Sequence, residues 1–237
     1  PLFYFHKRKQ NVYNNLIENS DPNTFEQIIN IINAMYPKGA IRILCIDCGN
    51  EALSIRLRDF RYAKGLADEI IDASSESPNP SMPFGYYQLD LNDVEQFDSF
   101  VYNFRGYFDL IVSIGTIERI ENPKYYLSSL SKMLYGDGHI FITIPTITNP
   151  VGRKFFYKYG KIINFTDKDI QNKSVILPHI FEQITSDVNL HICAEYPMGL
   201  YPKIWLYPSF NALNHTLCNL KMLRVKGSWL KLYILKR

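Results

Sequence analysis

The sequence predicts an α/β fold, in which one mostly parallel β-sheet is covered by helices on both faces. Short apolar runs alternate with longer segments whose apolar residues recur at helical spacing, from about residue 22 to residue 145. The runs are almost continuously apolar, which is typical of strands that are buried on both faces. Strands and helices that alternate in this way form right-handed β-α-β units and therefore a parallel sheet.

The first half of the chain begins with a helix. Asp21 and Pro22 supply a cap and a proline at the first helical position, and Pro37 and Gly39 end the helix. The apolar run that follows predicts a buried strand. In chain order, the expected elements are that strand at 41–46, a helix over about 52–62, a strand at 69–73, a Ser- and Pro-rich loop over 74–85, and a strand at 85–90.

The second half continues this alternation as far as Pro145. The expected elements are a helix at 92–104, a strand at 108–113, a helix at 121–134 that Gly136 and Gly138 close, and a strand at 139–145. Beyond Pro145 the periodicity weakens. We interpret 148–228 as irregular acceptor or cap insertions within the same single domain, 1–237. Further strands are expected at 190–196 and 229–235, with a helix from Pro208 to Met222 between them.

Composition excludes several classes of protein. Aromatic residues make up 14% of the chain, which is ample for a core and excludes disorder along its whole length. A net charge of +3 is too small to indicate a nucleic-acid binder, and four cysteines are too few for a disulfide scaffold. No apolar run has membrane-spanning length, and the first residues lack a signal-peptide pattern, so we expect a cytoplasmic protein.

Candidate ligand-binding residues follow the ends of the predicted strands, because open parallel sheets bind ligands at their carboxyl edge. Asp72 lies about 20 residues after the loop that follows the first strand, at the spacing of a carboxylate that grips a ribose diol. The alternative is that Asp72 only caps a loop. The candidates are Asp47, Gly49, Asn50 and Glu51 after the first strand, Asp72 in the second, Asp90 and Leu91 after the third, and Ser113 and Ile114 at the fourth.

Two segments resemble class I S-adenosylmethionine-dependent methyltransferases. The stretch FDLIVSIGTIERIENPKYYLSSLSKMLYGDGHIFITIPT (108–147) is similar to the family's "FDLIV…LEHVENP…LKPGGxLxIxxP" block, and ILCIDCGNEALSIRL (43–57) is similar to its cofactor loop, "ILDVGCGxGxLSxxL". The resemblance covers about residues 10–147, the cofactor-binding half. It implies a Rossmann-like, seven-stranded, mostly parallel sheet with an antiparallel last strand.

The resemblance also implies roles for the candidate residues. Gly49 shapes the cofactor loop, Asp72 holds the ribose, and Asp90 and Leu91 contact the adenine. Ser113 and Ile114 lie beside the methionine part, whereas Asp47, Asn50 and Glu51 contact the cofactor only if the loop adapts. It implies S-adenosylmethionine as cofactor, a small-molecule acceptor such as a sugar or another metabolite, and methylation at oxygen.

The chain departs from the family pattern in the cofactor loop. In the preferred register the motif acid falls on Cys45, the first glycine is Asp47 and the third is Glu51. A shift of two residues would place Asp47 on the motif acid instead. Arg119 replaces a histidine and places a permanent cation at the rim of the site. The alternative function is therefore a non-catalytic binding or scaffold domain. No residue is singled out as a catalytic base, and no metal site is expected.

Overall fold

The computed structural model describes residues 22–48, 52–76, 84–145, 157, 176–198 and 230–237. The chain divides into two compact units. The larger unit holds 29–144, 172–196 and 232–237, and most of its residues are described. The smaller unit holds 1–28, 145–171 and 197–231, and few of its residues are described. The single domain expected over 1–237 stays a prediction.

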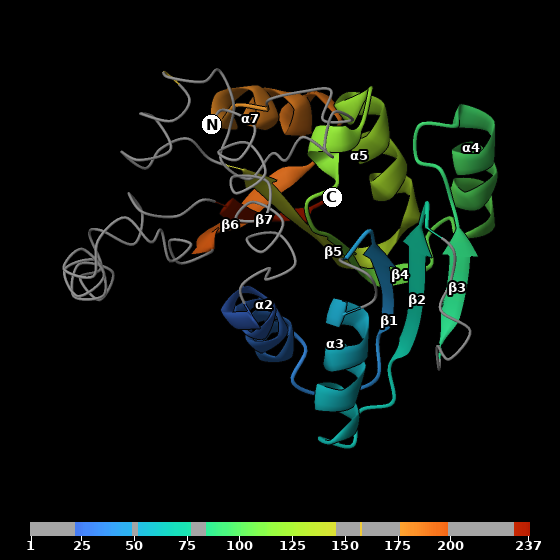
Figure 1. The fold of residues 1–237 in the computed structure, drawn as a ribbon, viewed down its shortest axis with the longest axis vertical. Coiled ribbons are helices and arrows are strands. Elements are labelled where there is room, and N and C mark those ends of the chain that lie inside the picture. The colour runs from blue at the N-terminus through green and yellow to red at the C-terminus, as the bar shows by residue number, and fades with distance from the viewer. Residues whose placement is uncertain (1–21, 49–51, 77–83, 146–156, 158–175, 199–229) are drawn as a thin grey trace, which may run out of the picture. The chain divides into compact units, whose positions relative to one another are not determined.

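The predicted fold class is confirmed by a seven-stranded sheet in the order β3-β2-β1-β4-β5-β7-β6 (Figure 1). β1 pairs in parallel with β2 and β4, and the β2–β3 and β4–β5 pairs are also parallel. β7 and β6 add the expected antiparallel pairing. The strands are β1 (Arg42–Ile46), β2 (Glu69–Ser74), β3 (Gly85–Gln88), β4 (Phe108–Ser113), β5 (Leu134–Pro145), β6 (His191–Met198) and β7 (Leu230–Lys236).

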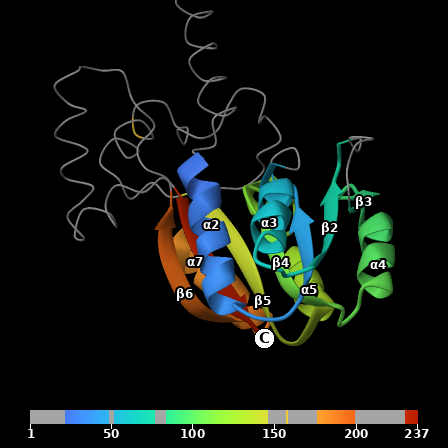
Figure 2. The ribbon, with the colours of Figure 1, turned by 90° about the horizontal axis from the view of Figure 1, so that it is seen from below.

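Helices lie on both faces of the sheet within the larger unit. α3 and residues 29–35 of α2 lie on one face, and α4, α5 and α7 lie on the other (Figures 1 and 2). Capping side chains fix two of these helices: Asp93 accepts from the amide of Gln96, and Asn122 from that of Tyr125. The helices are α2 (Pro22–Met35), α3 (Ala52–Tyr62), α4 (Val94–Asn103), α5 (Pro123–Met133) and α7 (Pro178–Asp187), with a 3-10 turn η1 (Ile117–Arg119) after β4.

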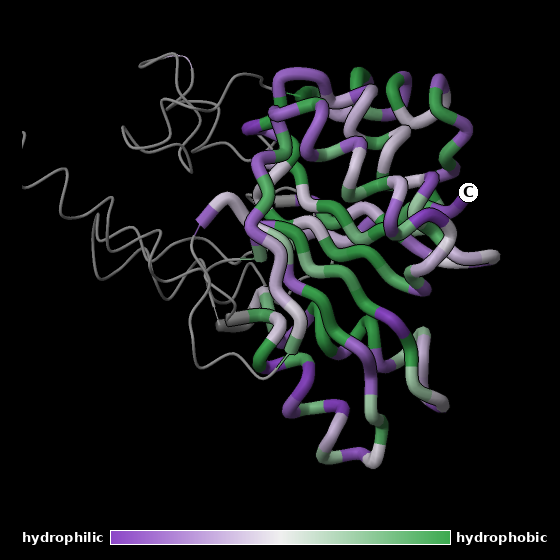
Figure 3. The backbone as a smooth tube through the Cα atoms, turned by 90° about the vertical axis from the view of Figure 1, so that its right-hand side faces the viewer, coloured by the Kyte–Doolittle hydropathy of each residue, from purple (hydrophilic) through white to green (hydrophobic). Residues whose placement is uncertain are grey.

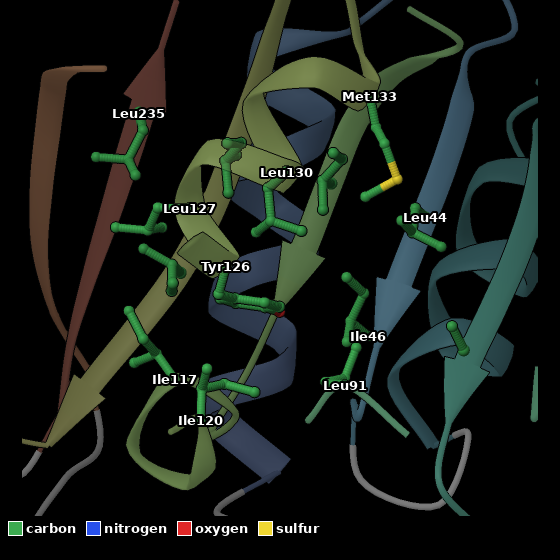
Figure 4. Packing of buried hydrophobic residues seen from close by; sticks show 14 of the residues in the cluster. Leu44, Ile46, Leu91, Ile117, Ile120, Tyr126, Leu127, Leu130, Met133 and Leu235 are labelled. Atoms are coloured by element: carbon green, nitrogen blue, oxygen red, sulfur yellow. The ribbon is translucent and has the colours of Figure 1, made fainter. Parts of the chain in front are cut away.

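The core forms where the hydrophobic strands meet α4 and α5. Figure 3 shows the strands as the most hydrophobic part of the described chain. Figure 4 shows the packing itself, in which side chains of α5 point toward those of β1 and β7. Leu44, Ile46, Tyr126, Leu127 and Leu130 are all fully buried in this cluster. Burial of each such side chain stabilises the fold by about 1.5–3 kcal/mol. The packed strands therefore give a rigid frame to the loops at either end.

One prediction about the second half of the sheet is wrong. Gly136 and Gly138 do not close the preceding helix at a loop but lie inside β5, which begins at Leu134. The pairing of β4 with β5 shifts its register between Phe108 and Leu110. A Cβ on Gly138 would lie 3.0 Å from three backbone oxygens, including that of Asp109. Gly138 therefore allows the close approach of neighbouring backbone, whereas Gly136, where an added Cβ would meet nothing within 4 Å, allows a left-handed backbone with φ of 46°.

Other boundaries also differ from the expectations. The third strand ends at Gln88, so Asp90 and Leu91 follow it, whereas β2 extends beyond Asp72 to Ser74. α7 was not expected at all, although Pro178 at its first turn and the buried Phe181 are ordinary helix signals. The helix expected from Pro208 to Met222 lies outside the described residues.

Candidate functional site

The candidate site lies at the carboxyl edge of the sheet, between β1 and β4. β1 continues to β2 on one side and pairs with β4 on the other, so the chain's direction of travel across the sheet reverses here. Ile46, the last residue of β1, is in register with Ser113, the last residue of β4. In open α/β sheets, ligands bind at the carboxyl ends of the strands where this reversal occurs. The residues that follow Ile46 and Ser113 therefore form the candidate site.

Asp47 leaves β1 in a left-handed backbone conformation, with φ of 49°. Asp is one of the few residues besides glycine that adopts this conformation readily. Its amide donates to the carbonyl of Ala73 in β2, at 3.0 Å. Its carboxylate accepts from Nη2 of Arg119 at 3.1 Å, and only 11% of the Asp47 side chain is exposed. Asp47, which follows β1, is thus held by Arg119, which follows β4.

The turn after β4 is fixed from both neighbouring strands. Gly115 has a φ of 67°, and its amide donates to Oγ1 of Thr143 in β5 at 2.9 Å. The hydroxyl of Thr116 donates to the carbonyl of Ile46 in β1 at 3.3 Å. Arg119 adds a bond from Nε to the carbonyl of Gly115 at 3.1 Å. Arg119 therefore links two left-handed residues, Asp47 and Gly115, at this edge, and Thr116 and Thr143 add bonds that hold the turn.

Ser113 and Cys48 point into the core rather than toward the edge. The Ser113 hydroxyl hydrogen-bonds to that of Tyr126 at 2.9 Å, and both side chains are fully buried. Burial raises the pKa of Tyr126 far above its ordinary value, so its hydroxyl keeps its proton. The Cys48 thiol donates to the carbonyl of Val112 at 3.3 Å, and burial raises its pKa as well. Cys48, Ser113 and Tyr126 therefore stabilise the strand ends from within the core.

Asp72 is buried within β2 and faces α3. Its side chain accepts a hydrogen bond from the hydroxyl of Ser54, and the residue is 2% exposed. Cys45 of β1 and Tyr86 of β3 are its neighbours in register. The structure therefore places a carboxylate against the start of α3, and it comes from the interior of the strand rather than from its end.

The remaining candidates are spread along the edge. Asp90 is exposed, and its carboxylate accepts from the amide of Asn92 at 2.9 Å, which shapes the turn into α4. Leu91 belongs to the core cluster, and Ile114 is partly buried beside Gly115. Gly49, Asn50 and Glu51 lie outside the described residues, as does most of the region 148–228.

The ion pair between Asp47 and Arg119 was not predicted. The two residues are separated by 72 positions, and each was considered only for its own charge. The pairing of β1 with β4 could have indicated this ion pair, because it brings together the residues that follow the two strands. Thr116 and Thr143, which position the turn, carried no signal in the sequence.

Within the described ranges, no group of at least three His, Cys, Asp or Glu side chains is arranged to hold a metal ion. Among the same residues, no helix combines the length and the apolar character that crossing a bilayer requires.

Comparisons with known proteins support the fold. No family model matches the sequence, and no curated protein matches it. Solved structures do match. A Mesorhizobium loti S-adenosylmethionine-dependent methyltransferase is 12% identical, with a TM-score of 0.54 over 88% of this chain and 96% of its own. The plantazolicin methyltransferase BpumL, solved with a triazolic desmethylPZN analog and SAH, is 17% identical, with a TM-score of 0.57 over 98% of this chain and 91% of its own.

A third match carries a different activity in its name. The [4+2]-cyclase SpnF is 9% identical, with a TM-score of 0.51 over 89% of this chain and 80% of its own. At these identities the likeness concerns the course of the backbone and not its chemistry. Sheet order, helix placement and structural matches agree on one conclusion: this chain has the Rossmann-like fold of class I S-adenosylmethionine-dependent methyltransferases.

Proposed function

We propose that the protein binds S-adenosylmethionine at the carboxyl edge of its sheet and transfers the methyl group to a small-molecule acceptor, at an oxygen atom. The observation that carries the proposal is the reversal point between β1 and β4, where Asp47 and Arg119 stand over adjacent strand ends. BpumL, which has the same fold, was solved with SAH and a substrate analog, which supports a ligand of this kind.

The described residues suit the parts of such a cofactor. Asp47 and Arg119 offer opposite charges, and the amino-acid end of S-adenosylmethionine also carries both charges. Asp72 offers carboxylate oxygens for the ribose hydroxyls, provided that Ser54 shares it. Asp90 and Leu91, beyond β3, offer an acceptor and an apolar surface to the adenine.

The bound cofactor supplies an electrophilic methyl group on a sulfonium sulfur. The contribution of this chain is mainly placement, because an acceptor that is held in line with that methyl reacts with a much smaller entropic cost. The doubly anchored turn at Gly115 and the rigid ends of β1 and β4 are suited to that task. An acceptor hydroxyl also needs a base. We assign none to the described residues.

A binding or scaffold domain is the second candidate. The observation that favours it is Asp47 itself, which occupies a position where the resembling family has glycine and which is already paired within the chain. The name of SpnF, a [4+2]-cyclase, indicates that this fold is also used for a chemistry other than methyl transfer.

Calorimetry with purified protein separates these candidates. Titration with S-adenosylmethionine, its demethylated product S-adenosylhomocysteine and NAD should show binding of the first two only. Product formation with a panel of hydroxylated metabolites then distinguishes an enzyme from a binding domain. Binding of NAD alone, or of none of the three, would contradict the proposal.

A matched pair of variants tests Asp72. Asp72→Asn should weaken cofactor binding by about tenfold or more, since hydrogen bonds to a charged group contribute about 1.5–3 kcal/mol. Ser54→Ala removes the hydroxyl that donates to Asp72 but keeps the carboxylate, so it should bind nearly as well as the wild type. Equal losses in both variants, accompanied by equal losses of thermal stability, would mean that Asp72 is structural only.

A further inference from the structure

Two buried thiols lie at the end of β1, and the proposed function uses neither of them. Cys45 and Cys48 have the spacing Cys-x-x-Cys, both are free thiols, and they are 0% and 2% exposed. In a strand that continued straight, residues 45 and 48 would point to opposite faces of the sheet, because successive side chains alternate. Their thiols can therefore meet only if the chain turns between them.

The backbone at Asp47 supplies this turn. Its left-handed conformation, with φ of 49°, follows directly after Ile46, the last residue of β1. The Cys48 thiol consequently returns against the strand that it follows. Its sulfur lies 3.4 Å from the carbonyl oxygen of Ile46 and 3.3 Å from that of Val112 in β4. Val112 is the register partner of Cys45, so the two cysteines are neighbours in space.

The two thiols also contact each other. The side chain of Cys48 is hydrogen-bonded to that of Cys45. Cys45 points toward α3, because it is in register with Asp72, whose carboxylate accepts from Ser54 of α3. Sulfur atoms at hydrogen-bond distance need only a small side-chain movement to reach the disulfide bond length of about 2.05 Å. The pair is thus prearranged for a disulfide.

We propose that Cys45 and Cys48 form a reversible disulfide that lowers the affinity of the protein for its cofactor. The link to the cofactor rests on the proposed function. The oxidant is a peroxide, which one thiolate attacks to give a sulfenic acid and, with the proton of the thiol, a water molecule. The second thiol attacks the sulfenic sulfur, which forms the S–S bond and releases a second water. Two electrons thus pass from the sulfurs to the peroxide, and a dithiol reductant returns them.

The disulfide changes the end of the strand from which Asp47 projects. It closes a ring over residues 45–48, with Asp47 inside the ring. A disulfide sulfur has no hydrogen, so the bond that the Cys48 thiol donates to Val112 is lost. The turn at Asp47, whose amide donates to Ala73 and whose carboxylate accepts from Arg119, therefore shifts in the oxidised form.

Burial controls when the pair reacts. It raises the pKa of the Cys48 thiol, so little thiolate is present at neutral pH, and a peroxide reaches this side chain only when the end of the strand opens. A ligand bound at the carboxyl edge should therefore slow the oxidation. The equilibrium follows as well, because coupling is reciprocal: the factor by which the disulfide weakens ligand binding is also the factor by which saturating ligand disfavours the disulfide.

Peptide mass spectrometry tests the bond. The protein is treated with hydrogen peroxide, its remaining thiols are alkylated, and it is digested with trypsin, which releases both cysteines in the single peptide 43–56. This peptide should carry no alkyl group and should weigh two hydrogen atoms less than its reduced form. Added S-adenosylhomocysteine should slow its formation. The exposed Cys193 reports in the same digest how far the peroxide has reacted.

Calorimetry tests the consequence. Oxidised wild type should bind S-adenosylhomocysteine about tenfold or more weakly than reduced wild type, and dithiothreitol should restore the binding. Cys193→Ala is the matched control and should respond to peroxide as the wild type does. Cys45→Ala and Cys48→Ala should each bind equally well before and after peroxide treatment, and melting temperatures establish that they are folded. In a glutathione redox titration of the wild type, saturating ligand should disfavour the disulfide by the factor found in calorimetry.

The outcomes separate the inference from the function on which it rests. The proposal is overturned if Cys193 is fully oxidised while peptide 43–56 still carries alkyl groups, or if the disulfide forms and the affinity for S-adenosylhomocysteine does not change. If the reduced wild type binds no S-adenosylhomocysteine, the proposed function fails and the regulatory role fails with it, while the mass of the peptide still decides whether the bond forms.

Discussion

Two ion pairs of equal length stand at opposite ends of the same strands and differ in how completely they are satisfied. At the amino edge, Arg42 donates to Asp109 through its backbone amide, Nε and Nη2, and its guanidinium lies 4.9 Å from the ring centre of Tyr107 and 4.7 Å from that of Tyr135. At the carboxyl edge, Arg119 gives one bond to Asp47 and one, through Nε, to the carbonyl of Gly115, and its other N–H groups have no partner in the described chain.

The difference between the two ion pairs indicates different roles for the two edges of the sheet. Arg42 and Asp109 are the first and second residues of neighbouring strands, so their geometry is set by the sheet and stabilises it. Asp47 and Arg119 follow their strands, and the backbone at Asp47 is left-handed. An ion pair on irregular backbone, with unused N–H donors, contributes less to stability than one held within the sheet. Its side chains can, however, bind a ligand in place of each other. The predictions below test this contrast, beginning with the largest effect.

Among the described glycines, Gly138 at the amino edge has the least room for a side chain. A methyl group there would press against the backbone oxygens of Phe108, Asp109 and Tyr135, which the paired strands hold in place. Gly138→Ala should therefore lower the free energy of unfolding by about 1–3 kcal/mol. Chemical denaturation measures this. The control is Gly85→Ala in β3, where the added carbon would make an ordinary 3.5 Å contact with Ile71 and stability should barely change. Equal stability of the two variants would contradict a rigid amino edge.

The two arginines should differ in the same assay. Arg42→Gln removes several bonds to a partly buried carboxylate and should lower the free energy of unfolding by about 1–2 kcal/mol. Arg119→Gln removes a single bond to its carboxylate, and its loss should be only about 0–1 kcal/mol. If Arg119→Gln proves the more damaging change, the carboxyl-edge pair is a structural latch and the contrast fails.

Acid should erase the effect of Arg42→Gln. Burial alone would raise the pKa of Asp109, but hydrogen bonds from Arg42 outweigh it and bring the pKa below its ordinary value. The unfolded chain therefore binds the proton first, so the pair stabilises the fold above about pH 4, and this stabilisation is lost as the pH falls through the pKa of the folded state. The stability difference between wild type and Arg42→Gln should shrink from pH 7 to pH 3. A constant difference would mean that Asp109 is not the group that responds.

The smallest effect concerns the backbone at Asp47. Asp47→Ala loses the ion pair and keeps a side chain in the left-handed region, whereas Asp47→Gly loses the ion pair but relieves the backbone by about 1 kcal/mol. The glycine variant should be the more stable of the two, and its unfolding should resemble that of the wild type within about 1 kcal/mol. A more stable alanine variant would show that the φ of 49° is not retained.

Local signals predicted most of the fold, and long-range contacts explain the errors. The helix at 52–62 and the strand at 108–113 match the structure because each rests on an uninterrupted apolar pattern. The start of β5 was misplaced because a glycine at a close strand crossing looks the same in sequence as one at a helix end. The site was predicted in part. Strand ends identified Asp47, but its partner Arg119 depends on the register of β1 and β4, which no local pattern encodes.

Hydrogen–deuterium exchange in the presence of S-adenosylhomocysteine tests the central claim, that the carboxyl edge between β1 and β4 binds this cofactor. The ligand should slow exchange in peptides that cover 46–48 and 113–119, where the amide of Gly115 depends on a side-chain acceptor. Peptides that cover 107–109 and 134–139, at the amino edge, should be unchanged. Protection at the amino edge instead, or no protection at either edge at saturating ligand, would contradict the account.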